Sequence, residues 1–251
     1  GEIFHLFASV EQLATMLQAK NETEHKTKEF LKSTISDISH QLKTPLAALM
    51  MYQEIIEAEP DNTDTVKEFS QKIGLALKRM EQLILSMLKI TRLDTGNILF
   101  DKRACSVQEL IKNAISELTT RATQEKKQLI VQGTPNQTVI CDMDWTSEAI
   151  GNLVKNALDH TEAGGIIRIT WESTPTMLRI LVSDNGSGIA PEDIHHIFKR
   201  FYRSKYSLNI PGIGLGLPLA KSIIEGQGGL ISVQSVLHEG TTFSVSFLTK
   251  S

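Results

Sequence analysis

An unbroken heptad of apolar residues is the feature that most constrains the fold of this 251-residue chain. Apolar side chains alternate at spacings of three and four over residues 66–90, a repeat that forms the seam of supercoiled helices. The seam consists of Val66, Phe69, Ile73, Ala76, Met80, Leu83, Met87 and Ile90. Leu77, Ile84 and Leu88 widen this apolar face beyond what one neighbouring helix covers. The pattern predicts a long helix that packs against more than one other helix.

A second amphipathic helix precedes the first. Its predicted buried stripe consists of Ile35, Ile38, Leu42, Leu46 and Leu49, which recur at helical spacing. We expect this helix to run to about Glu59, with a turn at Pro60-Asp61-Asn62 and a cap on the next helix from Thr63 or Asp64. A single hairpin of this kind buries too little surface, so we infer that two chains pair into a four-helix bundle.

His40 lies off the buried stripe of this helix. It follows Ile38 by two positions, about 200° around a helical wheel that advances ~100° per residue, so its ring is expected in solvent. Pro45 has no N–H to donate to the carbonyl of Gln41, which predicts a bend one turn after the histidine. An exposed, neutral imidazole can accept a phosphoryl group. A solvated histidine on an ordinary helical hairpin explains this stretch equally well.

Composition limits the class of protein. The chain is 41% hydrophobic and 22% charged, which suits two modest globular domains. A net charge of −3 gives no reason to expect nucleic-acid binding. Cys105 and Cys141 are far apart in sequence and lack metal-type spacing, so we expect free thiols in a reducing compartment. No apolar run approaches the roughly 18 residues that span a bilayer, so the chain is cytosolic in character.

Composition also changes along the chain. A short heptad run at the N-terminus predicts a coiled coil, and it comprises Ile3, Leu6, Val10, Leu13 and Leu17. Residues 18–29 are almost without apolar side chains and form either a flexible signalling segment or a plain helical connector. Residues 92–98 end the long helix at Gly96, and we expect a hinge near residue 97.

Strands and helices alternate after this hinge. The β-like runs are 128–132, 138–141, 166–171, 178–183, 229–235 and 242–247, and the helical patterns are 106–125, 145–160 and 215–226. Such mixing predicts an α/β sandwich with a core of its own.

Two polar motifs of this second domain suit a nucleotide. Asn152 and Asn156 are spaced i, i+4 on one helix face, and an amide oxygen is an adequate ligand for Mg²⁺. The apolar side of that helix is predicted to hold Ile150, Leu153, Val154, Ala157 and Leu158. Asp184 ends a strand and opens the sequence DNGSG, where a carboxylate can accept a hydrogen bond from an adenine amino group. Each motif alone is also typical of an ordinary polar surface.

A glycine-rich loop precedes the last predicted helix. Gly212, Gly214 and Gly216 supply backbone N–H groups that can cradle phosphates at a helix start. The spacing G-x-G-x-G after a polar segment excludes a Rossmann dinucleotide loop. Upstream, Phe198 and Phe201 either anchor a helix to the sheet or hold the base of a lid.

Taken in order, these motifs resemble those of sensor histidine kinases. SHQLKTPL at residues 39–46 is similar to the phospho-acceptor box of that family, and the likeness extends over nearly the whole chain from about residue 28. The resemblance implies a helical-hairpin dimerisation domain that forms a four-helix bundle in the dimer. An α/β sandwich of the histidine kinase, gyrase and MutL type would follow, making a multidomain α and α+β protein. The implied domains are a signalling helix at 1–27, a dimerisation and phosphotransfer domain at 28–96 and a catalytic ATP-binding domain at 97–251.

The resemblance also assigns roles to single residues. It makes His40 the phospho-acceptor, with Gln41, Lys43 and Thr44 beside it, and Thr44 is placed to orient a water for dephosphorylation. It implies ATP and Mg²⁺ as cofactors, with Asn156 as the metal ligand and Asp184 as the adenine contact. The nucleotide contacts it implies are Asn152, Lys155, Asn156, His160, Asp184, Gly186, Gly188, Tyr202, Arg203, Gly212, Gly214, Gly216, Leu217 and Thr242. Arg200 is an alternative phosphate contact, residues 204–211 would form a lid, and Gly240 to Phe243 match a closing glycine box.

Two departures from the family pattern leave alternatives open. Gln41 stands where the family commonly has an acidic residue, and an amide is not a general base. Autophosphorylation is then slow or uses another base such as Asp37, and a nucleotide-binding scaffold or a phosphatase-biased kinase stays an alternative function. Pro211 stands where glycine is frequent, which predicts a stiffer lid. A gyrase-like or MutL-like ATPase is disfavoured because those enzymes carry a Glu at the position of Asn152.

The family resemblance sets the expected partners and location. The implied partners are a second copy of the chain and the receiver domain of a response regulator, with no nucleic acid. The membrane would be reached only through segments absent from this chain, as the cytoplasmic portion of a membrane sensor.

Overall fold

The structure is a computed structural model that describes residues 32, 35–96, 98–205 and 212–249. The N-terminal heptad run, the segment 18–29, the hinge residue 97, Pro211 and most of the predicted lid lie outside these ranges. The chain divides into two compact units, residues 1–81 and 82–251.

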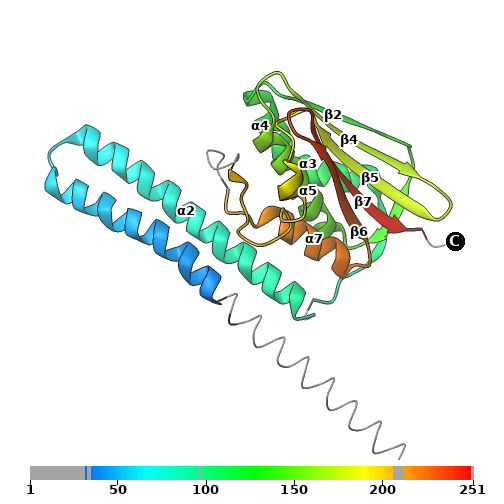
Figure 1. Cartoon of the computed structure of the whole chain (residues 1–251), viewed down its shortest axis with the longest axis horizontal. Coiled ribbons are helices and arrows are strands. Elements are labelled where there is room, and N and C mark those ends of the chain that lie inside the picture. The colour runs from blue at the N-terminus through cyan, green and yellow to red at the C-terminus, as the bar shows by residue number, and fades with distance from the viewer. Residues whose placement is uncertain (1–31, 33–34, 97, 206–211, 250–251) are drawn as a thin grey trace, which may run out of the picture. The chain divides into compact units, whose positions relative to one another are not determined.

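The first unit is a helical hairpin. One helix covers residues 35–58 and continues without interruption through Pro45. The second, α2, spans Thr63–Asp94 and runs antiparallel to it (Figure 1). The rings of Tyr52 and Phe69 pack across the hairpin, with centroids 5.6 Å apart. The predicted hairpin is therefore present.

The turn of the hairpin corrects one prediction. Asn62, and neither Thr63 nor Asp64, caps α2, because the Asn62 Oδ1 atom accepts a hydrogen bond from Thr65 N at 3.3 Å. Asn62 directly precedes the first helical residue, which is where an amide side chain reaches the unpaired N–H groups of the first turn. Glu59 accepts hydrogen bonds from the Asn62 amide at 2.9 Å and from the Thr65 hydroxyl at 3.0 Å, which closes the turn.

Exposure along the hairpin follows the predicted seam. All eight seam residues of α2 are half-buried or buried. Leu77, Ile84 and Leu88 are 53%, 44% and 52% exposed, which confirms that they extend beyond the face covered within one chain. The predicted burial of Ile35 and Leu46 is wrong for the single chain, where they are 63% and 50% exposed. One partner helix does not cover that side of the first helix.

The second unit is built on a five-stranded sheet with strand order β2-β4-β5-β7-β6. Its strands are β2 (Gln128–Gly133), β4 (Ile166–Ser173), β5 (Met177–Asp184), β6 (Leu230–Val236) and β7 (Gly240–Leu248). β2 pairs with β4 in parallel, and the other neighbouring pairs are antiparallel. A separate two-stranded sheet joins β1 (Arg103–Ser106) to β3 (Thr138–Cys141). All six predicted strands are confirmed, and β1 was not predicted.

Helices α3, α5 and α7 lie on one face of the large sheet (Figure 1). The helices of this unit are α3 (Val107–Ile115), α4 (Leu118–Gln124), α5 (Met143–His160), α6 (Pro191–Ile194) and α7 (Gly216–Gly226). The single helix predicted at 106–125 is wrong, because the chain breaks into α3 and α4. At the break, the Ser116 hydroxyl and backbone N–H both donate to Asn113 O, at 3.0 and 3.4 Å, and this tightens the last turn of α3.

The core lies between this helical layer and the sheet. The five α5 residues predicted to be buried, Ile150, Leu153, Val154, Ala157 and Leu158, each have 0% exposure. Ile167, Ile169, Ile180, Val182 and Phe243 of the sheet are equally buried, and α5 packs against β4 and β5. The α/β sandwich is confirmed, and α5 is its central helix.

Two further predictions concern the thiols and the membrane. Cys105 and Cys141 are both free and buried, and the Cys105 thiol donates to Cys141 O at 3.4 Å. Burial raises the pKa of Cys141 to about 12. Among the described residues, none of the helices combines the length and the apolar character needed to cross a membrane.

Candidate nucleotide site and acceptor histidine

His40 is exposed on the helix over residues 35–58, as its place on the helical wheel predicts. Gln41, Lys43 and Thr44 are exposed as well. The hydroxyl of the preceding residue, Ser39, donates to Ile35 O at 2.8 Å, so it is occupied by its own helix. The imidazole therefore stands on an open helical surface where a large partner has access.

Helix α5 carries most of the predicted nucleotide residues, and its start is firmly held. Asp142 caps it by accepting a hydrogen bond from Trp145 N at 3.2 Å. The Asp142 N–H donates to Gln227 Oε1 at 2.7 Å, and Gln227 Nε2 donates to the Thr146 hydroxyl at 3.0 Å. Gln227 follows the last residue of α7, so these bonds join the start of α5 to the end of α7.

The polar face of α5 lies between two glycine-containing loops. Asn152 donates to Glu148 O at 3.0 Å, and a Cβ atom placed on Gly216 would lie 3.2 Å from Asn152 Oδ1. Two turns later, His160 O accepts a hydrogen bond from Ser187 N at 3.0 Å. Asn156 is half-buried one turn from each of these residues on the same face. Asn152, Asn156 and His160 therefore line one surface that runs from the start of α7 to the DNGSG loop, whereas Lys155 is exposed.

Asp184 ends β5 with its carboxylate turned back onto the DNGSG loop. Its Oδ1 accepts a hydrogen bond from Gly186 N at 2.9 Å. Burial raises the pKa of Asp184, while hydrogen bonds from the backbone N–H groups of Gly186 and Thr241 act in the opposite direction. Gly188 has a φ of +66°, and a Cβ there would lie 2.0 Å from Val236 O, so this turn requires glycine.

The surroundings of His160 disfavour the charged form of its ring. Burial lowers its pKa, the Asp159 carboxylate raises it and the positive charge of Arg203 lowers it. The ring Nδ1 lies 3.5 Å from the Ser187 hydroxyl. Arg203 therefore lies close enough to this ring for its charge to act on it, and the assignment of both residues to one site stays a prediction.

The segment before the predicted lid is tied to the glycine-rich loop after it. Phe201 N donates to Gly214 O at 2.9 Å, and Phe201 itself has a φ of +59°. Gly214 has a φ of +74°, and a Cβ there would lie 2.8 Å from Tyr202 O. Phe198 packs edge-on against Phe243 of β7 with ring centroids 6.4 Å apart, which confirms that it anchors this segment to the sheet. Phe201 and Gly214, which flank the predicted lid in sequence, are thus in direct contact.

Tyr202 and Arg200 have partners of their own. The Tyr202 hydroxyl donates to Asp193, and hydrogen bonds from Ser204 and then Tyr202 lower the pKa of that buried carboxyl. Arg200 forms an ion pair with Asp94 at the end of α2. Glu148 likewise pairs with Lys89, with Nζ and Oε1 2.6 Å apart. Arg200 is therefore already paired with a carboxylate, and Glu148 is engaged by a cation.

The start of α7 offers backbone donors for phosphate. Its N-cap residue, Leu215, makes no side-chain capping bond, so the first N–H groups, beginning at Gly216, are not satisfied by a capping side chain. Leu217 is half-buried, and the Thr242 hydroxyl donates to Ser183 at 3.0 Å. Backbone N–H groups, the cation of Arg203, two amide oxygens and one carboxylate fit the phosphates and the base of an adenine nucleotide.

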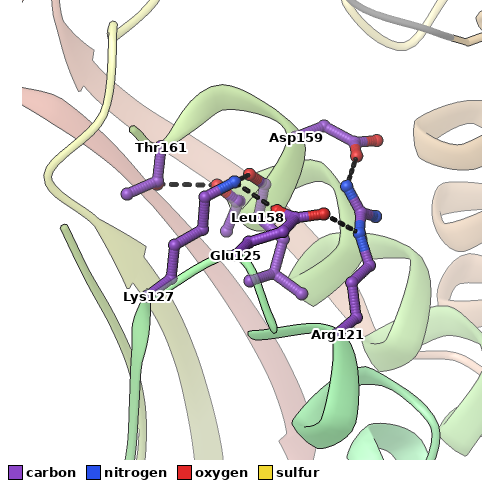
Figure 2. A network of polar contacts seen from close by, with 7 residues as sticks. Arg121, Glu125, Lys127, Leu158, Asp159 and Thr161 are labelled. Carbon is purple, nitrogen blue, oxygen red and sulfur yellow. Dashed lines mark hydrogen bonds and ion pairs between the residues drawn. The ribbon is translucent and has the colours of Figure 1, made fainter. Parts of the chain in front are cut away.

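Four residues behind this site were missed by the sequence analysis. Arg121 bridges Glu125 and Asp159, with both N···O distances 2.6 Å, as Figure 2 shows. Lys127 pairs with Glu125 and donates to Leu158 O at 2.8 Å. The only local signal was the i, i+4 spacing of Arg121 and Glu125, because Asp159 lies 38 positions away in sequence.

Comparison with known proteins agrees with this organisation. The phospho-acceptor domain model named His Kinase A matches residues 13–96. The model described as histidine kinase-, DNA gyrase B-, and HSP90-like ATPase matches residues 141–251. A match to this second model implies ATP binding. The predicted domain boundary at 96/97 falls at the end of the first match and otherwise stays a prediction.

Similar proteins are sensor kinases. Sensor-like histidine kinase SenX3 of Mycobacterium tuberculosis is 28% identical over 214 residues, which is 84% of this chain and 52% of that protein. Sensor protein SrrB of Staphylococcus aureus is 30% identical over 225 residues, or 88% of this chain and 39% of that protein. The chain thus spans about half or less of these relatives, at 52% and 39% of their lengths.

Solved structures show the same fold. The histidine kinase ThkA, crystallised with the response regulator protein TrrA, has a TM-score of 0.74 at 22% identity, covering 92% of this chain and 66% of that one. At this identity the likeness shows the fold alone. The two domain matches and the sensor-kinase relatives, together with the exposed His40 and the polar face of α5, show that this chain belongs to the sensor histidine kinases of two-component systems.

Proposed function

We propose that this chain is the kinase core of a two-component sensor, in which His40 accepts the γ-phosphoryl group of ATP held on α5. The observation that carries this proposal is the combination of an exposed histidine in a phospho-acceptor box with a separate domain. On that domain the face of Asn152, Asn156 and His160 meets the DNGSG loop. The acceptor and the nucleotide residues lie in different compact units of one chain. Such a division of roles suits transfer to a protein side chain.

The reaction is a displacement at phosphorus. A neutral ring nitrogen of His40 attacks the γ-phosphorus of ATP, the new N–P bond forms as the bond to the β,γ-bridging oxygen breaks, and ADP leaves. The imidazole N–H proton passes to water or to a nearby base. Catalysis consists mostly of positioning and charge neutralisation, as phosphoryl transfer generally does.

Asn156 is the residue we assign to Mg²⁺. Among the described residues, no group of three or more His, Cys, Asp or Glu side chains is placed to hold a metal ion. A single amide ligand fits Mg²⁺, which completes its octahedral shell with water and phosphate oxygens. When bound, the ion would neutralise charge on those oxygens. Asp184 would accept from the adenine amino group, and the N–H groups at the start of α7 would hold phosphate oxygens.

The phosphoryl group would next pass to an aspartate of a response-regulator receiver domain docked on the hairpin. ThkA, which shares this fold, is known in complex with such a regulator. A homodimer follows from the apolar residues that the single hairpin leaves exposed, Leu77 and Ile84 among them. The relatives are longer sensor proteins, so we place this chain as the cytoplasmic part of a membrane sensor.

One labelling experiment tests this function. The chain is incubated with γ-³²P-labelled ATP and Mg²⁺, and protein-bound label is compared with free phosphate. We expect label that is stable in base and lost in acid on the wild type, and none on His40→Ala, while ADP affinity is the same for both. Free phosphate without protein label would identify an ATPase, and neither product would identify a nucleotide-binding scaffold.

A second candidate function rests on Gln41. The residue next to the acceptor is an exposed neutral amide, which can hydrogen-bond the ring but takes no proton. A kinase with this substitution would work mainly as a phosphatase on the regulator, with Thr44 orienting the water. In that case the wild type removes label from a pre-phosphorylated regulator faster than it labels itself, and Thr44→Ala loses the removal.

A further inference from the structure

The α5 face that carries the nucleotide residues also carries a carboxylate. Asp159 follows Asn156 by three positions and Asn152 by seven, so all three lie within about 60° of one another on the helix. The Asp159 side chain is only 17% exposed. A negative charge there would repel the phosphates that the same face is expected to hold.

Arg121 neutralises this carboxylate from α4. Its Nη2 donates to Asp159 Oδ1 at 2.6 Å, and its Nε donates to Glu125 Oε1 at 2.6 Å (Figure 2). The guanidinium is thus held by a neighbour one turn away on its own helix and presented to α5. An arginine is suited to this bridging task because its donors lie in a rigid plane.

Lys127 fixes the other side of the network. It pairs with the second oxygen of Glu125 and donates to Leu158 O, one of the last carbonyls of α5, at 2.8 Å. Its side chain is 10% exposed. One turn of α5 is further closed by the Thr161 hydroxyl, which donates to Ala157 O at 2.7 Å. The positive charges of Arg121 and Lys127 equal the negative charges of Glu125 and Asp159. The network therefore holds the end of α5 in place and has no net charge.

We propose that Arg121 is a positioning residue for nucleotide binding, which neutralises Asp159 and so allows the polar face of α5 to accept an anionic ligand. This inference rests on the proposed function, since it takes Asn152 and Asn156 to face the phosphates. Arg121 acts through Asp159 and does not itself contact the nucleotide. Removing Arg121 exposes the repulsion, and removing Asp159 as well abolishes it.

The test is a double-mutant cycle with Arg121→Gln and Asp159→Asn in the full chain. The affinity for Mg²⁺-ATP is measured by calorimetry. We expect Arg121→Gln to weaken ATP binding about fivefold or more, from one uncompensated charge near the phosphates. Asp159→Asn alone is expected to bind as tightly as the wild type or more tightly, and the double variant to return to within about twofold of the wild type. The matched control is Arg179→Gln, which removes the ion pair between Arg179 of β5 and Glu172 of β4. This variant should bind ATP as tightly as the wild type does.

A spectroscopic readout separates charge from structure. Because the Asp159 carboxylate acts on the His160 ring, Arg121→Gln should raise the pKa of His160 in an NMR titration, and the double variant should restore it. If Arg121 had only a structural role, the double variant would bind ATP as weakly as Arg121→Gln, or Asp159→Asn alone would already bind ATP weakly. Either result overturns the inference. If Arg121→Gln does not fold, the ATP affinity of Asp159→Asn tests the inference by itself, and binding weaker than that of the wild type overturns it. A wild type that binds no ATP would instead refute the proposed function.

Discussion

Burial of Asp184 favours the neutral form of its carboxyl group, whereas the adenine contact proposed for it uses the carboxylate. Burial raises its pKa, so the folded protein binds this proton more tightly than the unfolded chain does. Its contribution to the free energy of unfolding is therefore greatest in acid. That contribution falls as the pH rises from the ordinary carboxyl range through the raised pKa. A carboxyl group in a place that disfavours its charged form is typical of a group kept for binding.

Replacing Asp184 with asparagine should separate stability from binding. The introduced amide keeps an oxygen to accept from the N–H groups of Gly186 and Thr241, but it presents no charge. We expect Asp184→Asn to unfold at the same temperature as the wild type or higher, and to lose the pH dependence described above. Its affinity for ADP should fall by at least about tenfold, the cost of one charge-assisted hydrogen bond. Thermal unfolding with and without ADP measures both, with the exposed Asp61→Asn as control. ADP stabilisation equal to that of the wild type would refute the adenine contact.

Gln41 gives a second prediction at the scale of one residue. A carboxylate beside His40 can take the imidazole proton, and general base catalysis typically accelerates proton transfer by roughly 100-fold or more. We expect Gln41→Glu to raise the rate of phosphohistidine formation by at least about tenfold, with an unchanged ADP affinity. Single-turnover labelling with Gln71→Glu, a charge change on the exposed surface of α2, provides the comparison. Equal rates for Gln41→Glu and the wild type would show that another base already serves.

At the scale of elements, two glycines should respond oppositely to the same substitution. Gly188 has a left-handed backbone and no room for a side chain, whereas a Cβ at Gly74 of α2 meets nothing within 4 Å. Gly188→Ala should therefore lower the free energy of unfolding of the second unit by more than about 1 kcal/mol and weaken ADP binding. Gly74→Ala should stabilise the hairpin by about 0.5–1 kcal/mol, because alanine is the better helix former. Chemical denaturation followed separately in the two units measures both changes. Equal effects would contradict the assigned loop conformation.

The accuracy of the sequence predictions depended on whether the determining contacts are local. The heptad of α2, the α5 face and the strands β2 to β7 were predictable because burial on one side leaves a period in the sequence. β1 was not, because its four residues gain strand character only by pairing with β3. At the break between α3 and α4, the Ser116 hydroxyl and backbone N–H both donate to Asn113 O, and no period in the sequence marks this position. In the site, the sequence predicts Asn152, Asn156 and Asp184 because each belongs to a recognisable local motif. The contact of Arg121 with Asp159 was not predictable, because the two residues come together only in the folded chain.

At the scale of the whole molecule, the hairpin has an apolar surface that one chain does not cover. Leu77 and Ile84 are one heptad apart on α2 and are 53% and 44% exposed, and Leu46 of the first helix is 50% exposed. A continuous heptad with exposed flanking leucines is the pattern of a helix in a bundle. We therefore propose that this surface is half of an interface and that a second copy supplies the matching half, because a two-fold axis pairs identical surfaces.

Disrupting this surface should separate dimerisation from nucleotide binding. We expect the wild type to have twice the 27.9 kDa mass of one chain in light scattering after gel filtration. The double variant Leu77→Glu with Ile84→Glu should have the mass of one chain, because it buries charges in an apolar seam. Its ADP affinity should be unchanged, since both residues lie outside the nucleotide site. Leu99→Glu, at a residue that is 97% exposed and lies outside the hairpin, is the control and should remain dimeric. A monomeric wild type would refute the bundle, because the exposed stripe would then need a different partner.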